Sequence, residues 1–212
     1  MSSAQRTSAK RILEAVKEAI PRITGLSRPE HRFAALIAVI NRVVEESFGG
    51  RVIVVGGFAL ELLLGGTTRT LDVDIIVTGY EAYKAVEEAL QQLSRVYEES
   101  ARGPVISLAG VEKAIDLLGP VYRSSFDPIR VEVPGFGWFY LEAPEQLLIR
   151  YLREWVYWDS EEARRRVLLI IGALGDEIDI SAVEKTLQEE DKRLLEALRE
   201  IVKILKRRGV MA

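Results

Sequence analysis

The chain opens with two stretches whose apolar residues recur every three or four positions, the spacing of an amphipathic helix. The first covers residues 10–20, and Pro21 is expected to end or kink it. The second begins near Ser27, which we expect to form a capping box with Glu30, and it stops at Gly49. Two N-terminal helices are therefore predicted.

Short β-branched runs follow. Residues 51–55 form an apolar run that predicts a strand buried on both faces, leading into Gly56-Gly57 and a short helix. Residues 71–77 predict a second strand and residues 80–94 another helix. Further strands are expected at residues 105–108, 113–118, 131–133 and 138–141, the last two as a hairpin.

Beyond Pro144 the pattern is helical alone, with helices expected at residues 145–158, 161–174, 181–189 and 192–207. Ser181 and Glu184 have the spacing of a second capping box. We therefore predict an α+β fold in which a mixed sheet flanked by helices occupies residues 1–142 and a helical region occupies residues 143–212.

The composition places few limits on this picture. Of the 212 residues, 48% are hydrophobic and 29% are charged, as in an ordinary globular protein. No apolar run approaches the roughly 18 residues of a membrane helix, and the N-terminus is polar rather than apolar as in a signal peptide. We expect a cytoplasmic protein with no membrane partner. Abundant Glu, Lys and Arg with a single Asn are compatible with a thermophile.

The residue types present limit which side chains could bind a metal ion. Cysteine is absent and His31 is the only histidine, which excludes disulfides, thiolate metal sites and metal sites built on two histidines. His31 lies near a helix start, where we expect a surface or capping role. The net charge of −3 argues against a protein that coats nucleic acid with its whole surface. Carboxylates are the remaining plentiful ligands, and they suit Mg²⁺ or Mn²⁺.

Asp72 and Asp74 stand in an otherwise apolar strand. Because side chains alternate across a strand, both carboxylates are expected on one face, with Val73 on the other. Two like charges on a mostly buried strand favour a bound cation. The structural alternative would need neutralising partners, of which Arg69 is one candidate.

Two further features complete a candidate site. Gly56-Gly57 joins a strand to a helix, where backbone N–H groups are exposed to an anion and glycine lets a phosphate come close. Asp116 is again a single carboxylate in an apolar strand. If that strand lies beside residues 71–77, Asp116 completes a triad.

This combination resembles the nucleotidyltransferase superfamily related to DNA polymerase beta, and within it the AbiEii-type toxins and minimal nucleotidyltransferases. The resemblance rests on Gly56-Gly57, on the run Arg69-Thr70-Leu71-Asp72-Val73-Asp74, and on the later Asp116. Weaker matches at Ala143-Pro144-Glu145 and Leu174-Gly175-Asp176 extend it over roughly residues 51–187.

The resemblance implies a nucleotidyltransferase-like fold and transfer of a nucleoside monophosphate from a nucleoside triphosphate (NTP) to a hydroxyl of RNA or protein. It implies that Asp72, Asp74 and Asp116 are catalytic and ligate Mg²⁺ or Mn²⁺, with Asp116 helping to deprotonate the attacking hydroxyl. Nucleotide binding would fall to Gly56, Gly57, Arg69 and Thr70. A toxin–antitoxin pair, with an antitoxin as partner, is a further expectation.

Two residues depart from the family pattern. Phe58 stands where the family often has a hydroxyl residue after the second glycine, and Tyr151 stands where a lysine is usual in the helix after Pro144. These departures favour an alternative interpretation, in which the chain is a catalytically silent binding or antitoxin-type module on the same fold.

Overall fold

The computed structural model describes residues 3–94, 99–100 and 103–209. The chain divides into two units, the first comprising Met1–Arg123 and Pro128–Glu142, the second Ser124–Asp127 and Ala143–Ala212. Met1 and Ser2, which begin the polar N-terminal stretch, lie outside the described residues. In the described part of the chain, no helix has the length and apolar character that crossing a membrane requires.

A mixed sheet forms the centre of the first unit. Within the described residues it has seven strands in the order β3-β4-β5-β2-β1-β7-β6. Strand β1 pairs antiparallel with β2 and parallel with β7, while β2 pairs parallel with β5. The strands are β1 (Val52–Val55), β2 (Asp72–Val77), β3 (Glu99–Ser100), β4 (Gly103–Leu108), β5 (Val111–Gly119), β6 (Ile129–Val133) and β7 (Gly137–Leu141). The predicted α+β class is confirmed, and the predicted hairpin is the β6–β7 pair.

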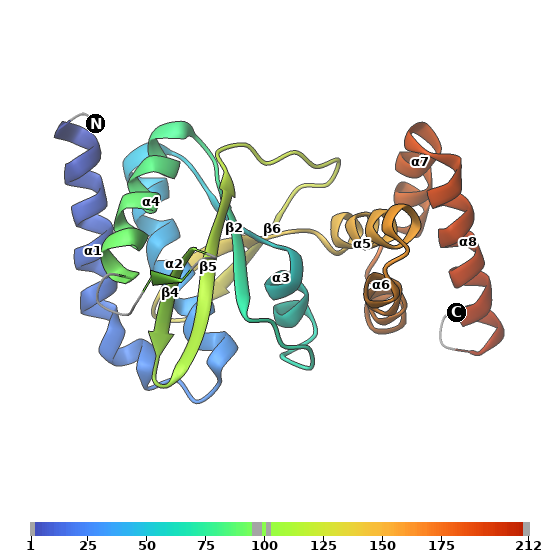
Figure 1. Ribbon diagram of the computed structural model, residues 1–212, viewed down its shortest axis with the longest axis horizontal. Coiled ribbons are helices and arrows are strands. Elements are labelled where there is room, and N and C mark those ends of the chain that lie inside the picture. Colours follow the sequence, from blue (N-terminus) through green and yellow to red (C-terminus); the bar gives the residue numbers. More distant parts are fainter. Residues whose placement is uncertain (1–2, 95–98, 101–102, 210–212) are drawn as a thin grey trace. The chain divides into compact units, whose positions relative to one another are not determined.

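Helices flank this sheet. Figure 1 shows α1, α2 and α4 packed beside one another and α3 next to β2. Helix α2 ends as predicted at Gly49, whose left-handed backbone (φ 63°) directs its N–H to the carbonyl oxygen of Glu45 at 2.9 Å. The helices of the first unit are α1 (Ser3–Thr24), α2 (Pro29–Phe48), α3 (Gly56–Leu63) and α4 (Tyr80–Ser94).

In the first two helices, one predicted end, at Pro21, and one predicted cap, at Ser27, are wrong. Helix α1 continues through Pro21, because its last turn buries Ile23 completely and that burial offsets the backbone hydrogen bond that proline removes. The capping box at Ser27 is wrong. Arg28 is the N-cap residue of α2 and makes no side-chain cap bond, and Glu30 forms an ion pair with Arg28 at 2.5 Å instead.

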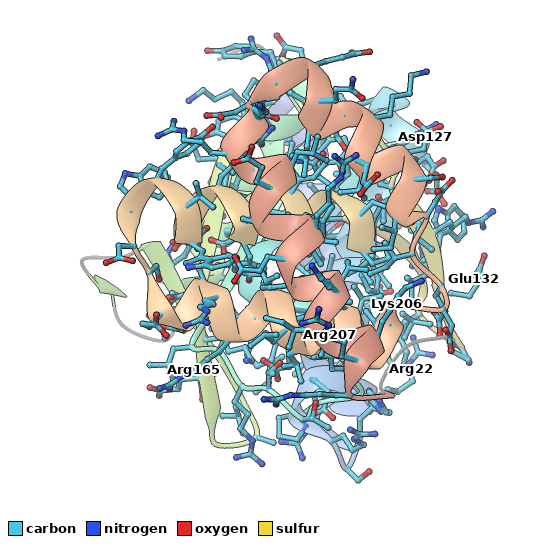
Figure 2. All side chains as sticks on the ribbon, turned by 90° about the vertical axis from the view of Figure 1, so that its right-hand side faces the viewer. Arg22, Asp127, Glu132, Arg165, Lys206 and Arg207 are labelled. Atoms are coloured by element: carbon cyan, nitrogen blue, oxygen red, sulfur yellow. The ribbon has the colours of Figure 1, made fainter. Side chains whose placement is uncertain are left out.

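The second unit is helical. Its helices are α5 (Pro144–Trp158), α6 (Glu161–Leu174), α7 (Ile180–Glu190) and α8 (Lys192–Arg207). Helix α5 packs against α6, α7 and α8. Buried Leu198 and Ile201 form part of the apolar face of α8. Lys206 and Arg207 lie in its last turn (Figure 2), where positive charge complements the helix dipole.

The start of α7 differs from the prediction. Its cap is Asp179, whose carboxylate accepts the N–H of Ala182 at 3.0 Å. Ser181 donates its hydroxyl to the same carboxylate at 2.5 Å, and Glu184 bonds to Arg199 at 2.9 Å. The capping box of Ser181 with Glu184 is therefore wrong, because an aspartate two residues earlier takes the cap and an arginine of α8 takes the glutamate.

The cap of α8 makes the second unit sensitive to acid. Asp191 accepts the Nη2 and the backbone N–H of Arg193, each at 2.8 Å, and the hydroxyl of Tyr157 at 2.9 Å. These bonds, the one to the Arg193 side chain foremost, hold the pKa of Asp191 well below its ordinary value. Since the folded state binds this proton less tightly than the unfolded state, the stabilisation is complete above the ordinary pKa of about 3.9 and is lost as pH falls below it.

We therefore expect the melting temperature to fall on acidification below about pH 4, and Asp191→Asn to show a shallower fall. Circular dichroism melts of both proteins at each pH measure the two slopes. Equal slopes for the variant and the wild-type protein would contradict the assignment to Asp191.

Candidate functional site

Strand β2 carries two aspartates on one face. Burial alternates along it: Val73 and Ile75 are fully buried, while Asp72 and Asp74, each one position earlier, are half-buried. Successive residues of a strand point to opposite faces, so both carboxylates lie on the face away from Val73. Their Cα atoms are roughly 6.6 Å apart along the strand.

The third aspartate lies on the neighbouring strand. Strands β2 and β5 lie side by side (Figure 1) and pair in parallel. Asp74 is in register with Asp116, while Asp72 is in register with Ala114. Paired residues on adjacent strands point to the same face at a spacing of about 4.8 Å between strands. The strand adjacency on which the triad depended is therefore present, and it brings Asp116 closer to Asp74 than to Asp72.

Gly56 makes room for one of these carboxylates. Val55, at the end of β1, is in register with Asp74, and the chain then turns into α3 through Gly56 with φ +65°. A Cβ atom at Gly56 would lie 2.8 Å from Oδ2 of Asp74. The sequence predicted that glycine admits a phosphate here. In the structure the group that comes close to its backbone is the Asp74 carboxylate.

A fourth carboxylate, absent from the sequence prediction, binds the same glycine. The N–H of Gly56 donates to Oε2 of Glu142 at 3.0 Å, and Glu142 is buried, with its own N–H donating to the carbonyl oxygen of Val54 at 2.8 Å. One of the amides expected to bind phosphate is thus bonded to the protein itself. The pairing links residues 86 positions apart, so no local pattern indicates it.

Thr70 and Arg69 precede β2 in the loop after α3. The Thr70 hydroxyl accepts the N–H of Asp72 at 3.3 Å, and it would lie 3.2 Å from a Cβ atom at Gly57. Arg69 is exposed. The residues assigned to the nucleotide by resemblance therefore lie around the start of β2, and Thr70 has a local role in fixing that start.

A buried ion pair lies against the loop that carries Thr70. Lys113 Nζ lies 3.0 Å from Oε2 of Glu61, and both side chains are only 4% exposed. The ammonium also donates to the carbonyl oxygen of Thr70 and lies over the ring of Phe58 at 5.0 Å. Glu61 in turn accepts the N–H of Thr70 at 2.9 Å. Lys113 and Glu61 were missed from sequence, although a single charge in an otherwise apolar helix, as Glu61 is in α3, is a signal for a buried pair.

The two residues that depart from the family pattern both serve the core. Phe58 is fully buried and meets Phe33 edge-on, with 6.4 Å between ring centroids. Tyr151 is buried in the second unit, where Nη1 of Arg166 donates to its hydroxyl at 3.1 Å. Burial raises the pKa of Tyr151, and the positive charge of Arg166 opposes that rise. Neither side chain is available to replace the missing hydroxyl or lysine.

A preformed metal centre is not found. Among residues 3–94, 99–100 and 103–209, no three His, Asp or Glu side chains are grouped so as to hold a metal ion. Asp72, Asp74 and Asp116 share one face of the sheet through the register of β2 with β5. Their hard carboxylate oxygens nevertheless fit a divalent cation chemically, and metal ligation by these residues stays a prediction.

The contact between Gly56 and Asp74 predicts the effect of Gly56→Ala. The added methyl group would press on the Asp74 carboxylate, in addition to the strain of a left-handed alanine of about 1–2 kcal/mol. Gly65→Ala is the matched control, since Gly65 has φ +61° but open space around its Cβ position. We expect Gly56→Ala to cost roughly 1–3 kcal/mol more than Gly65→Ala in urea unfolding. Equal losses would show that the carboxylate moves away freely.

Comparison with known proteins found a structural similarity and no sequence match. No family model matches the chain, and no curated protein sequence matches it. Among solved structures, the chain is similar to the antibiotic-resistance factor ANT(2'')-Ia, with 18% identity and a TM-score of 0.43 over 82% of this chain and 96% of that one.

Proposed function

We propose that the first unit is the catalytic part of a divalent-metal-dependent nucleotidyltransferase. The observation that carries the proposal is the register of Asp74 with Asp116 on adjacent parallel strands, with Asp72 on the same face of β2. Carboxylates so placed repel one another and are stabilised by a cation. With two histidine ligands excluded by composition, Mg²⁺ or Mn²⁺ is the cation that this oxygen donor set suits.

The reaction would be an in-line displacement at the α-phosphorus of a nucleoside triphosphate. A hydroxyl oxygen of RNA or protein forms the new bond to phosphorus, the bond to the bridging oxygen breaks, and pyrophosphate leaves. Asp116 would accept the hydroxyl proton, and Asp72 and Asp74 would hold the cation. A bound divalent cation would stabilise the charge on the attacking and leaving oxygens.

The nucleotide would be held near the start of α3. Gly57 stays the candidate for a backbone contact to phosphate at this helix N-terminus, because the N–H of Gly56 is bonded to Glu142. Exposed Arg69, in the loop before β2, is the candidate cation for the same phosphates. Thr70 is bonded to Asp72 and would act on the nucleotide through the position of β2.

Label transfer tests this proposal. The protein is incubated with each nucleoside triphosphate labelled at the α-phosphate, with Mg²⁺ or Mn²⁺, and with RNA or cell protein as acceptor. We expect label in one acceptor class, its loss on chelation, and no transfer from γ-labelled nucleotide, which separates nucleotidyl from phosphoryl transfer. Absence of transfer from every α-labelled nucleotide would overturn it.

A toxin–antitoxin role belongs to the same proposal. Induced expression in a bacterial host should then arrest growth, and a protein encoded beside this chain should relieve the arrest. Normal growth at high expression of active protein would contradict the toxin role while leaving nucleotidyl transfer intact.

A silent module on this fold is the second candidate, and specific observations favour it. Glu142 already bonds to the Gly56 amide, and the side chains of Phe58 and Tyr151 are buried in the core. Calorimetry with Mg²⁺ and a non-hydrolysable nucleoside triphosphate separates the candidates. Heat of binding that disappears in Asp74→Asn supports the enzyme, whereas no heat at all supports the silent module.

A further inference from the structure

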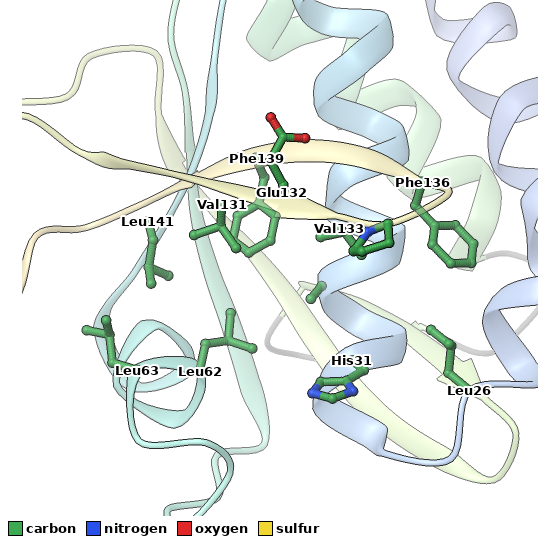
Figure 3. Close-up of a pocket in the computed structure, with 12 residues that line it drawn as sticks. Leu26, His31, Leu62, Leu63, Val131, Glu132, Val133, Phe136, Phe139 and Leu141 are labelled. Atoms are coloured by element: carbon green, nitrogen blue, oxygen red, sulfur yellow. The ribbon is translucent and has the colours of Figure 1, made fainter.

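A cavity of about 630 Å³ lies within the first unit, between the β6–β7 hairpin, the start of α2 and the end of α3 (Figure 3). Its volume falls within the roughly 300–1,000 Å³ of small-molecule sites. The wall is predominantly apolar, with Leu62 and Leu63 from α3 facing Val131, Phe139 and Leu141 from the hairpin.

The cavity is separate from the aspartates. Val55 is in register with Asp74, whereas Val54 is in register with Leu141. Neighbouring residues of a strand point to opposite faces, so Leu141, and with it Phe139 two residues earlier, point away from the face that carries Asp74. A ligand in this cavity would therefore leave the carboxylates uncovered.

One polar side chain faces the cavity. His31 lines it and reaches toward Leu62 in Figure 3. Glu132 also belongs to the wall, but its carboxylate lies on the far side of the hairpin from Val131, as strand alternation requires, and it is paired with Arg130 at 2.7 Å. The imidazole thus gives an otherwise apolar space one hydrogen-bonding point.

The charges around the cavity favour an anion. The guanidinium of Arg22 lies 5.0 Å above the ring of Phe136, which forms one end of the cavity, and its Nη1 donates to the carbonyl oxygen of Gly135 at 3.2 Å. The acidic side chain nearest in sequence to His31, Glu30, is paired with Arg28 at 2.5 Å. The local field is therefore positive, with the guanidinium of Arg22 as its source.

We infer that this cavity is a second binding site, which takes a small amphipathic carboxylate: an apolar body against the leucines, valine and phenylalanine, and an anionic head that accepts a hydrogen bond from His31. The apolar body gains from leaving water, and the head gains from the bond to the imidazole and the field of Arg22. This assignment gives the single histidine of the chain a role, and it stands whether or not the aspartates catalyse nucleotidyl transfer.

Calorimetry with decanoate and decanol, used as probes below their micellar concentrations, tests the inference on the full chain. We expect decanoate to bind saturably at one site and decanol to bind about tenfold more weakly, the scale of one hydrogen bond to a charged group. His31→Ala should abolish this preference, and Glu132→Gln, whose side chain points away, should leave it unchanged.

Two cavity-filling variants complete the test. Leu63→Trp and Val131→Phe each add bulk at half-buried wall positions and should remove binding of both probes while circular dichroism stays native. The inference is overturned if wild-type protein does not bind decanoate, if decanol binds equally well, or if folded filling variants still bind. A dimer that sedimentation detects in wild-type protein and not in Leu63→Trp, with no decanoate binding, would assign the cavity to a second copy instead.

Discussion

Replacing Asp74 or Asp116 with asparagine is expected to lower nucleotidyl transfer by roughly 10²–10³-fold or more, the scale of losing one preorganised electrostatic contact in a transition state. The two residues are register partners on β2 and β5, so each substitution removes one of the two closest carboxylates on the shared face. Asp72→Asn should have a smaller effect, because Asp72 is in register with Ala114 rather than with an acid. Initial rates at saturating nucleotide measure the three losses.

Glu112→Gln is the control for this series. Glu112 is an exposed acid on the same strand as Asp116 and should keep the wild-type rate. Melting curves must show that each asparagine variant is folded, so that a loss of rate is not a loss of structure. Full activity in Asp74→Asn would overturn the role of the site, and an Asp72→Asn loss larger than that of Asp116→Asn would move its centre to β2 alone.

The largest effect on stability is expected from Lys113→Met. Lys113 and Glu61 are both 4% exposed, so the substitution leaves a buried carboxylate without its cation, at a cost of about 3–5 kcal/mol. The double variant Lys113→Met with Glu61→Gln should regain part of this loss, because glutamine removes the buried charge and still offers an acceptor to the Thr70 N–H. Urea unfolding of the wild-type protein and the variants gives the free energies.

Lys84→Met is the matched control for the buried pair. Lys84 and Glu87 approach more closely, at 2.7 Å, but their side chains are 35% and 33% exposed. Solvent screens a pair that is one third exposed, so this variant should be nearly neutral. Similar losses from Lys84→Met and Lys113→Met would mean that distance, rather than burial, sets the strength of these pairs.

Local sequence patterns predicted most helices and strands, and they predicted that the two aspartates of β2 share one face. The period of apolar residues predicted α4 and α6 with the observed bounds, and alternation predicted that Asp72 and Asp74 lie together. Glycine in the left-handed conformation ends α2 at Gly49, as expected. These features depend on residues within a few positions of one another, which is the range that a single sequence reports.

Other features depend on partners distant in sequence. The pairing of β2 with β5, the bond from Gly56 to Glu142, and the contact of Lys113 with Glu61 each join segments separated by a helix or several strands. The short strand β3 was not predicted either, because a strand of two residues leaves no periodic pattern. At the start of α7, both Asp179 and Ser181 have side chains that can cap a helix. In the structure the carboxylate of Asp179 accepts the N–H of Ala182 and the hydroxyl of Ser181, so Asp179 is the cap.

The position of β6 at the end of the sheet has a consequence for association between molecules. An edge strand offers unpaired backbone groups to which a second chain can add. Here the outward positions of β6 carry Arg130 and Glu132, both exposed and joined to each other at 2.7 Å. Burying these charges against another strand would cost their hydration. The edge is therefore protected against strand addition, and we expect the sheet to resist aggregation along this side even at high protein concentration.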